Sequence, residues 1–302
     1  MVPSGKRAAG NADRLSDLPD GLVHNIMSFL SAREAVQTCV LSRRWEDLWC
    51  SMPCLNIDER GFCAIVQGFD DEWDMYDDEA DIDKTRFEDF VTNLLMFHSA
   101  PMLDEFRLRA VAHVVSDREI KLVNSWLRRG IKRRPRVVEI RSNYDCKLPL
   151  LGSSSSRLNR LHLIGIALDT TFTQQLRSSC PVLEDLELER CRLDDDAEIV
   201  SSALKKLTIE DCTTENPSPL TIEAPSLTYL QLVITALDNN WQAVVVNEMP
   251  LLIKATICVK HSKAMLPCKL LCSLIHVKDL ELTGLRTLVY MSLMLVNIFF
   301  LD

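Results

Sequence analysis

Apolar residues recur in the second half of the chain in a six-residue frame, L-x-x-L-x-L, in which apolar and polar positions alternate at the end. Six copies begin, in order, at Leu158, Leu183, Leu204, Leu227, Leu252 and Val277, and the copy at Leu252 fits the frame only weakly. Successive copies begin 25, 21, 23, 25 and 25 residues apart, a regularity that chance would hardly produce. Residues 103–108 and 138–140 carry two earlier, degenerate copies.

Each copy predicts a short β-strand, because alternating apolar residues turn one side of an extended segment toward a core. The residues from Leu183 to Leu193 resemble the leucine-rich-repeat consensus, with Cys191 at its Asn/Cys position, and Cys212 occupies the same place one copy later. One such repeat cannot bury its own apolar side, so the copies should stack into a solenoid. The predicted fold is therefore α/β, an irregular leucine-rich-repeat solenoid with a wall of parallel strands.

The polar residues that alternate with the leucines should face away from the core and form the candidate substrate-binding surface. They are Arg160, His162, Asp185, Glu187, Glu189, Lys206, Thr208, Glu210, Tyr229, Gln231, Lys254 and Thr256. Mixed charge of this kind contributes specificity and register to a protein contact more than raw affinity.

Residues 18–49 have a helical rather than a strand period, and they predict three short helices. The first follows Pro19, which suits an initial helical turn, and its apolar residues are Leu22, Ile26, Phe29 and Leu30. A capping box at residues 31–34 opens the second helix, and the tryptophans at 45 and 49 share one side of the third. Three helices of this size bury too little surface to be stable alone, so the block should dock on the rest of the chain or on a partner.

The segments 18–20 (LPD), 26–30 and 40–49 (VLSRRWEDLW) resemble the F-box in the form common in plant proteins, and the resemblance covers about residues 14–54 without gaps. It implies that the block binds the Skp-family adaptor of a cullin–RING ubiquitin ligase, with apolar helix surface entering a groove of that partner. By this similarity the adaptor-binding residues are Leu18, Pro19, Leu22, Ile26, Leu30, Val36, Leu41, Arg43 and Trp45. Leu18, Ile26 and Trp45 are expected on an exposed surface.

The whole arrangement resembles plant F-box/leucine-rich-repeat proteins. It divides the chain into a disordered N-terminus (1–12), the F-box (13–54), a connector (55–100), the repeat array (101–287) and an apolar C-terminal tail (288–302). The tail is atypical, because such arrays need a polar cap and often carry a further domain, so we expect a shortened product or an incorrect gene model. Its 14-residue apolar run, 288–301, is shorter than the roughly 20 residues that cross a bilayer, and no membrane contact is expected.

The connector and the residues after it contain two charged segments. Residues 70–83 hold nine carboxylates and predict a solvated loop, after which a capping box at Thr85 and Glu88 should open a helix. A second helix is predicted near residues 117–129, ending at Gly130. The basic residues at 128–136 could be a nuclear import signal or a phosphate contact, but cations that stabilise a helix C-terminus are the favoured interpretation.

Net charge and cysteine usage narrow the class of protein. A formal charge of −9 and a pI near 5.3 argue against a dedicated nucleic-acid binder. Eleven cysteines, behind an N-terminus without a signal-type apolar segment, indicate reduced thiols in an intracellular protein, cytoplasmic or nuclear. The pairs Cys50/Cys54 and Cys268/Cys272 lack a matching second pair, so neither a metal nor another cofactor is expected.

No G-x-S-x-G, H-E-x-x-H or P-loop motif occurs, and the six histidines are scattered singly, so the chain is not expected to be an enzyme. The resemblance to F-box/leucine-rich-repeat proteins implies the substrate-recognition subunit of an SCF-type cullin–RING ubiquitin ligase. Such a subunit contributes proximity, since it holds a substrate lysine near a charged conjugating enzyme. The alternative is a leucine-rich-repeat scaffold that binds partners without any ligase.

Overall fold

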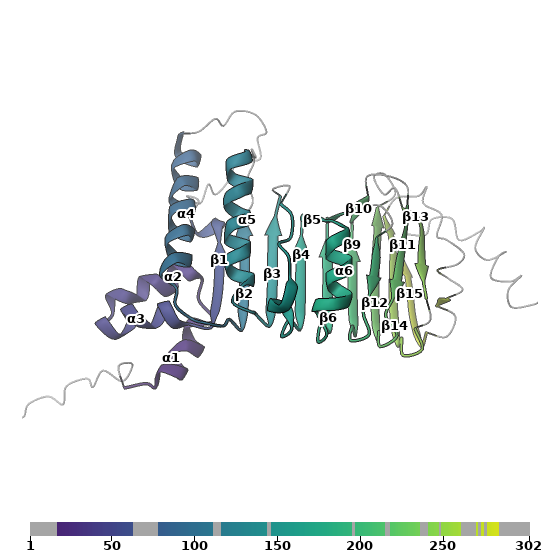
Figure 1. Ribbon diagram of the computed structural model, residues 1–302, viewed down its shortest axis with the longest axis horizontal. Helices are drawn as coiled ribbons and strands as arrows, with labels where there is room; N and C mark the ends of the chain where they lie inside the picture. The colour runs from purple at the N-terminus through teal and green to yellow at the C-terminus, as the bar shows by residue number, and fades with distance from the viewer. Residues whose placement is uncertain are drawn as a thin grey trace, which may run out of the picture.

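The computed structural model describes residues 17–62, 78–110, 116–143, 146–194, 197–214, 218–235, 241–247, 249–260, 270, 273–274 and 277–283. The predictions for residues 1–12, 70–77 and 288–302, and for Cys268 and Cys272, fall outside these residues. In the described part, a group of short helices precedes a long array of parallel strands (Figure 1). This is the predicted α/β architecture, a helical block followed by a solenoid.

A parallel sheet of nine strands forms one wall of the solenoid, in the order β1-β2-β3-β4-β6-β9-β12-β14-β15. Its strands are β1 (Cys54–Asp58), β2 (Glu105–Ala110), β3 (Val137–Ser142), β4 (Arg160–Ile164), β6 (Asp185–Glu189), β9 (Lys206–Glu210), β12 (Tyr229–Thr235), β14 (Lys254–Lys260) and β15 (Asp279–Thr283). All eight strands that the repeat frame predicts are confirmed. Strand β1 is not among the predicted ones, and it pairs with β2 and joins the sheet to the helical block.

The leucine positions of neighbouring strands lie in register and fill the core. One row consists of Ile57, Leu108, Ile140, Leu163, Leu188, Ile209, Leu232 and Ile257, each at most 2% exposed. Burial of one such side chain stabilises the fold by about 2 kcal/mol. The neighbouring row, which contains Leu230 and Ala255, ends at the edge strand β15 in Leu280. This residue is 41% exposed, because no further strand of the described residues pairs with β15.

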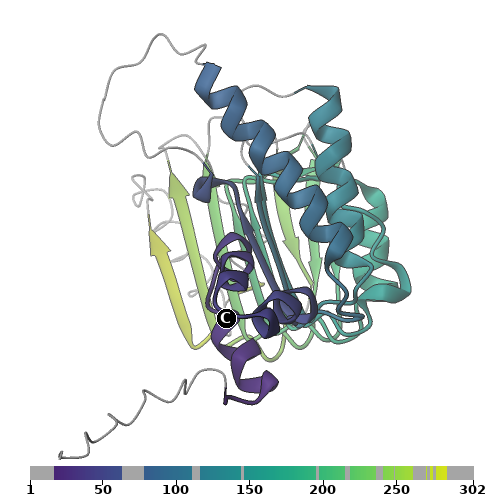
Figure 2. The same ribbon diagram turned by 90° about the vertical axis from the view of Figure 1, so that its left-hand side faces the viewer.

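The connections between strands cover one face of the sheet and leave the other open (Figures 1 and 2). They contain the helices α4 (Asp78–Phe97), α5 (Asp117–Ile131) and α6 (Thr170–Ser179) and the turns η2 (Glu59–Gly61) and η3 (Gly152–Ser155). They also form two three-stranded parallel sheets, made of β5 (Ala167–Leu168), β7 (Arg192–Leu193) and β10 (Thr213–Thr214), and of β8 (Glu198–Val200), β11 (Ser218–Glu223) and β13 (Trp241–Val246).

Three successive repeats turn the same corner after their strand. Gly165, Arg190 and Asp211 follow β4, β6 and β9 with φ values of 68°, 49° and 50°. The backbone N–H of each donates to a carbonyl of the next strand, for example Arg190 to Glu210 at 2.8 Å. At Gly165 the absence of a side chain is required, because a Cβ there would lie 2.0 Å from the Ser142 carbonyl oxygen.

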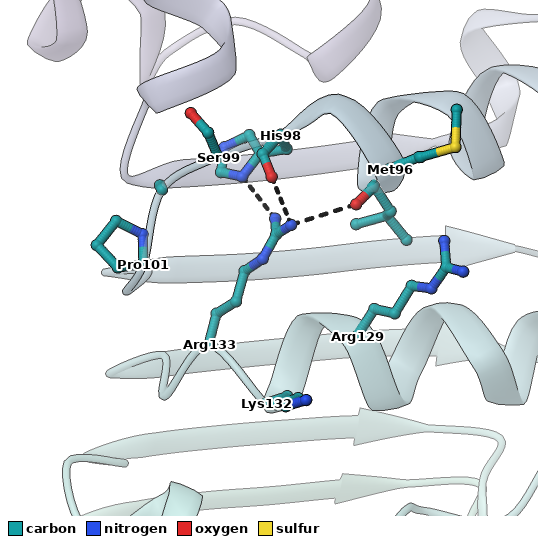
Figure 3. Close-up of a pocket in the computed structure, with 9 residues that line it drawn as sticks. Met96, His98, Ser99, Pro101, Arg129, Lys132 and Arg133 are labelled. Carbon is teal, nitrogen blue, oxygen red and sulfur yellow. Dashed lines mark hydrogen bonds between the residues drawn. The ribbon is translucent and has the colours of Figure 1, made fainter.

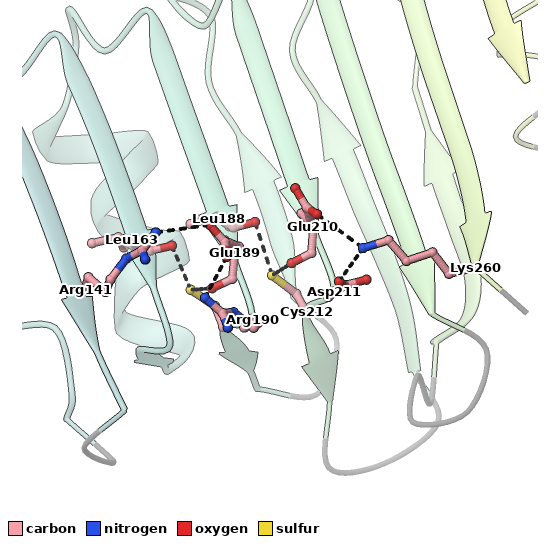
Figure 4. Close-up of polar contacts among 10 residues, drawn as sticks. Arg141, Leu163, Leu188, Glu189, Arg190, Glu210, Asp211, Cys212 and Lys260 are labelled. Carbon is pink, nitrogen blue, oxygen red and sulfur yellow. Dashed lines mark hydrogen bonds and ion pairs between the residues drawn. The ribbon is translucent and has the colours of Figure 1, made fainter. Parts of the chain in front are cut away.

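Cys191 and Cys212 follow two of these corners and point into the core. Their Sγ atoms donate to the Leu163 and Leu188 carbonyl oxygens at 3.3 and 3.5 Å (Figure 4). A buried carbonyl at the end of each strand thereby gains a partner, which is a structural reason for the Asn/Cys position of the repeat.

Two helix boundaries differ from the prediction. Helix α4 begins at Asp78, so Thr85 lies inside the helix, and residues 78–83 are its first turns rather than a loop. An acidic sequence is compatible with the start of a helix, because the N-terminal end of a helix carries partial positive charge. Helix α5 begins at Asp117 as predicted but continues through Gly130 to Ile131. Gly130 permits close packing instead of ending the helix, since a Cβ there would lie 2.3 Å from the Phe106 ring.

The N-terminal block consists of α1 (Asp20–Met27), α2 (Ala32–Gln37), η1 (Thr38–Val40) and α3 (Arg43–Ser51). The predicted capping box is present, with Ser31 N–H donating to Glu34 Oε2 at 2.9 Å and Glu34 N–H donating to Ser31 Oγ at 3.3 Å. The block buries Val23, Met27, Ala32, Ala35, Trp45 and Leu48 in a cluster that continues into Met52 and Leu55 of the solenoid. The block therefore docks on the rest of the chain, as its small size requires.

Candidate partner-binding surfaces

The N-terminal block exposes five large apolar side chains within twenty residues. The exposed fractions are 50% for Leu22, 44% for Ile26, 89% for Phe29, 85% for Val40 and 59% for Leu41. We call this set the N-terminal apolar surface. Exposed apolar surface of this extent is typical of a protein-interaction site, because water contact with it costs free energy that a partner would remove.

Helix α1 divides its apolar residues between two sides. Val23 and Met27 face the core and are fully buried, whereas Leu22 and Ile26, four residues apart, share an outer side. Polar contacts fix this orientation against α3. His24 Nε2 lies 3.3 Å from the Leu48 carbonyl oxygen.

A second contact ties the start of α1 to α3. The Arg44 guanidinium donates to the Leu18 carbonyl oxygen and to the Asp20 carboxylate. An arginine can bridge two acceptors in this way because its donors form a planar fork. The apolar side chains of α1 are thereby held outward by the fold itself.

The residues predicted to bind the adaptor fall into three groups. Leu22, Ile26, Leu41, Pro19 and Arg43 are exposed, and Leu18, Leu30 and Val36 are half-buried and pack against the core. The expectation that Trp45 lies on the exposed surface is wrong, since only 4% of it is accessible. It shares the inner side of α3 with Leu48, three residues on, and both pack into the block. The adaptor-binding role of the other residues stays a prediction.

Phe29 and Val40 are the most exposed members of the N-terminal apolar surface and are absent from the predicted set. The periodicity assigns Phe29 to the apolar side of the first helix, but α1 ends at Met27 and Phe29 lies beyond it. Val40 belongs to the η1 turn. The helical periodicity of apolar residues does not tell whether a given residue faces the core or a partner. The sequence therefore carries no signal that distinguishes Phe29 and Val40 from the buried apolar residues of the block.

The second candidate surface is the open face of the nine-stranded sheet, which we call the strand wall. Its side chains stand in rows that cross the strands in register. The central row is Asn56, Arg107, Glu139, His162, Glu187, Thr208, Gln231, Thr256 and Glu281. These residues alternate with the buried leucines, so the structure brings the predicted candidate residues together on one face.

Ion pairs link the middle strands of the wall. Asp185 is flanked by Arg160, with Nε at 2.9 Å, and by Lys206, with Nζ at 3.6 Å. Lys206 also pairs with Glu187, whose carboxylate lies 3.5 Å from His162 Nδ1. Asp185 is buried, against the expectation that it is exposed, because the two cations beside it cover it.

These pairs determine the charge states in the middle of the wall. Partial burial opposes the ionised form of Glu187, but the hydrogen bond from Lys206 and the nearby cations outweigh it and lower the pKa of this carboxyl. For Lys206, burial is likewise outweighed by its two carboxylate partners, which raise its pKa. Both groups are therefore charged at neutral pH and hold each other in place.

The ends of the wall carry similar pairs. Arg107 lies 2.9 Å from Glu105 on its own strand and 3.6 Å from Glu139 on the next. Lys260, the last residue of β14, reaches Asp211 at 2.7 Å, at the corner after β9 (Figure 4). Such partly exposed pairs contribute little stability each, but they present a fixed mosaic of charge to a binding partner.

Metal binding and thiol reactivity can be assessed for the described residues. No group of three or more His, Cys, Asp or Glu side chains that could hold a metal ion occurs among them. Burial and the neighbouring carboxyls of Glu105 and Asp104 raise the pKa of the Cys54 thiol to about 11. A thiol nucleophile needs the opposite shift.

No helix in the described part of the chain combines the length and apolar composition needed to cross a membrane.

Comparison with known proteins identifies relatives of both parts. The F-box domain family matches residues 15–56. An F-box/LRR-repeat protein of Arabidopsis thaliana is 30% identical over 246 residues, which are 72% of this chain and 72% of the relative. The meiotic F-box protein MOF of Oryza sativa subsp. japonica is 34% identical over 237 residues, 74% of this chain and 46% of that protein.

An F-box/FBD/LRR-repeat protein of Arabidopsis thaliana is 31% identical over 256 residues, which cover 74% of this chain and 53% of the relative. The chain thus spans about half the length of several curated relatives that it matches. No solved structure matches it.

Proposed function

Because the chain belongs to the plant F-box/LRR-repeat family, we propose that it is the substrate-recognition subunit of an SCF-type cullin–RING ubiquitin ligase. In this role the F-box binds a Skp-family adaptor, and the strand wall binds the protein to be ubiquitinated. The observation that carries the proposal is the N-terminal apolar surface, which the fold exposes on a block that packs firmly against the solenoid.

The N-terminal apolar surface supports adaptor binding because its side chains are largely exposed among the described residues. Leu22 and Ile26 stand one helical turn apart on α1, the spacing with which an amphipathic helix enters a groove. Phe29 supplies an aromatic anchor beside them. A few such anchors carry most of the energy of an interface.

The strand wall supports substrate binding because it combines fixed charge with breadth. Its rows run across nine strands, and the ion pairs described above hold the charged side chains in defined positions. A protein surface with matching charges could dock there without reorganising the wall. The names of the relatives, F-box/LRR-repeat proteins, support a non-catalytic adaptor, and we further propose that it acts in the cytoplasm, the nucleus or both.

Binding to a purified Skp-type adaptor tests the proposal. The double change Leu22→Asp/Ile26→Asp places charge on the outer side of α1, and we expect it to weaken binding at least about thirtyfold, the effect of losing one strong anchor of about 2 kcal/mol. The matched control is Leu150→Asp, because Leu150 is 74% exposed and lies in the connection between β3 and β4. Calorimetry of the full chain gives the dissociation constants.

A chain that binds no adaptor, or a double variant that binds as tightly as the unchanged chain, would contradict the proposal. The first result would favour the alternative, a leucine-rich-repeat scaffold that binds partners without a ligase. Circular dichroism of each variant shows whether the fold is kept, which is expected because both side chains are on the outer side of α1.

A further inference from the structure

A shallow cavity of about 520 Å³ lies between the C-terminal ends of α4 and α5, on the helix-covered side of the molecule (Figure 3). Met96, Ser99 and Pro101 line it from α4 and the segment after that helix, and Arg129 and Lys132 line it from α5 and its C-terminal end. We call it the basic pocket. It belongs neither to the N-terminal apolar surface nor to the strand wall.

Arg133 and His98 form the floor of the basic pocket and are already engaged. Arg133 donates to the His98 carbonyl oxygen at 2.7 Å and to the Leu95 carbonyl oxygen at 3.2 Å. These are carbonyls at the end of α4, which the helix itself leaves without partners. Arg133 therefore acts as the favoured interpretation of the basic segment expects, as a cation at a helix C-terminus. The helix that it caps is the neighbouring α4 rather than α5.

The remaining cations of this segment donate to no helix carbonyl among the described residues, although Arg128 and Arg129 lie in the last turn of α5, where positive charge is favourable. Arg128, Arg129, Lys132, Arg134 and Arg136 form no ion pair with a carboxylate among the described residues. Most other arginines of the sheet and helices are paired, and the chain as a whole carries a net charge of −9. A cluster of unpaired cations in an acidic chain creates a local positive field that attracts an anionic group.

An apolar rim accompanies this charge. Met96 lines the pocket with 60% of its surface exposed, and Phe97 beside it in α4 is equally exposed. Methionine adapts its shape to varied apolar partners. An inorganic ion would use the cations but not this rim, whereas a peptide that carries both acidic and apolar side chains would use both.

We propose that the basic pocket docks an acidic segment of a partner protein, whose carboxylates pair with Arg129 and Lys132 while an apolar side chain covers Met96. The Ser99 N–H donates to the Cys50 carbonyl oxygen at 2.7 Å, so the pocket lies directly beside the end of α3. A partner bound there would reach the flank of the F-box and leave the strand wall free.

A labelled peptide in which glutamate and leucine alternate serves as the probe, and fluorescence anisotropy with the full chain gives its affinity. We expect Arg129→Glu/Lys132→Glu to weaken binding at least tenfold and Met96→Ser at least threefold. The control Lys121→Glu/Lys147→Glu makes the same change in net charge at two exposed lysines outside the pocket and should stay within twofold of the unchanged chain.

Equal weakening by both charge-reversed pairs would mean that the peptide senses only net charge, and it would overturn the proposal. Displacement of the peptide by millimolar inorganic phosphate, together with no effect of Met96→Ser, would reassign the pocket to a small anion and would also overturn it. Adaptor affinity is measured for the same variants. An unchanged adaptor affinity separates failure of this proposal from failure of the proposed function.

Discussion

At the residue scale, His98 shows how one side chain links three parts of the chain. Its Nε2 lies 3.0 Å from the Met52 carbonyl oxygen at the start of the solenoid, and its Nδ1 faces the Arg133 guanidinium. Arg133 can only donate, so Nδ1 must accept and Nε2 must carry the proton. The imidazole is therefore neutral, and burial, aided by the positive charge of Arg133, lowers the pKa of His98 to about 4.

This arrangement predicts a specific loss of stability in mild acid. Because the folded-state pKa is about 4 and the unfolded value is near 6.5, the unfolded chain binds the proton more readily between these two pH values. The contribution to the free energy of unfolding is complete above pH 6.5 and falls by about 3 kcal/mol as the pH drops to 4. Urea unfolding of the chain at pH 7 and pH 4.5 measures it.

The variant His98→Gln isolates this contribution, since glutamine keeps an acceptor and a donor but does not titrate. It should be less stable than the unchanged chain at pH 7 and should lose less stability than that chain on going to pH 4.5. Carboxyl groups such as Asp58 titrate in both proteins and cancel in the comparison. Identical pH dependence in the two proteins would contradict the assigned charge state.

At the scale of single elements, two helical glycines predict opposite responses to the same change. Gly21 in α1 has no atom within 4 Å of an added Cβ, whereas a Cβ at Gly130 in α5 would lie 2.3 Å from the Phe106 ring. Gly21→Ala should stabilise the chain by roughly 0.5–1 kcal/mol through helix propensity. Gly130→Ala should destabilise it by roughly 1–3 kcal/mol, because Phe106 is fully buried and must move.

Thermal denaturation of the two single variants beside the unchanged chain measures both effects. A Gly130→Ala variant at least as stable as the unchanged chain would show that the close contact with Phe106 relaxes without cost.

The same elements show what the sequence can and cannot predict. The repeat frame predicts eight strands, because alternation with a fixed spacing has one structural meaning. Strand β1 carries the same alternation, Met52-x2-Leu55-x-Ile57, but it begins 51 residues before the copy at Leu103, so the repeat spacing does not identify it. Gly130 is indistinguishable by sequence from a helix-ending glycine, and only the Phe106 ring opposite it explains why α5 continues.

At the candidate sites, too, the sequence predicts some features, and only the structure reveals others. Alternation places the residues of the strand wall correctly but does not reveal that Arg160 and Lys206 cover Asp185. In the helical block, periodicity finds the apolar residues but not their direction. Trp45 therefore lies inside against expectation, and Phe29 lies outside.

At the scale of the whole molecule, the F-box and the solenoid share one continuous apolar core. The cluster that contains Trp45 and Leu48 continues through Met52 and Leu55 into the stacked rows of the sheet. Under the proposed function, a shared core of this kind would fix the direction of the strand wall relative to a bound adaptor. In a ligase, that geometry decides which part of a substrate reaches the conjugating enzyme.

A shared core predicts that the helical block and the neighbouring repeats unfold together. Trp45→Ala should lower the free energy of unfolding by about 3–5 kcal/mol, the range for removing a buried aromatic side chain, and should shift the single transition as a whole. Far-ultraviolet circular dichroism follows the helices, and hydrogen exchange at β2 and β3 follows the repeats. The control Phe29→Ala removes an aromatic side chain that is 89% exposed and should change stability by less than about 0.5 kcal/mol. If Trp45→Ala lost the N-terminal helices while the protection of β2 and β3 stayed unchanged, the helical block would be an independent folding unit. The connection between a bound adaptor and the strand wall would then be flexible rather than rigid.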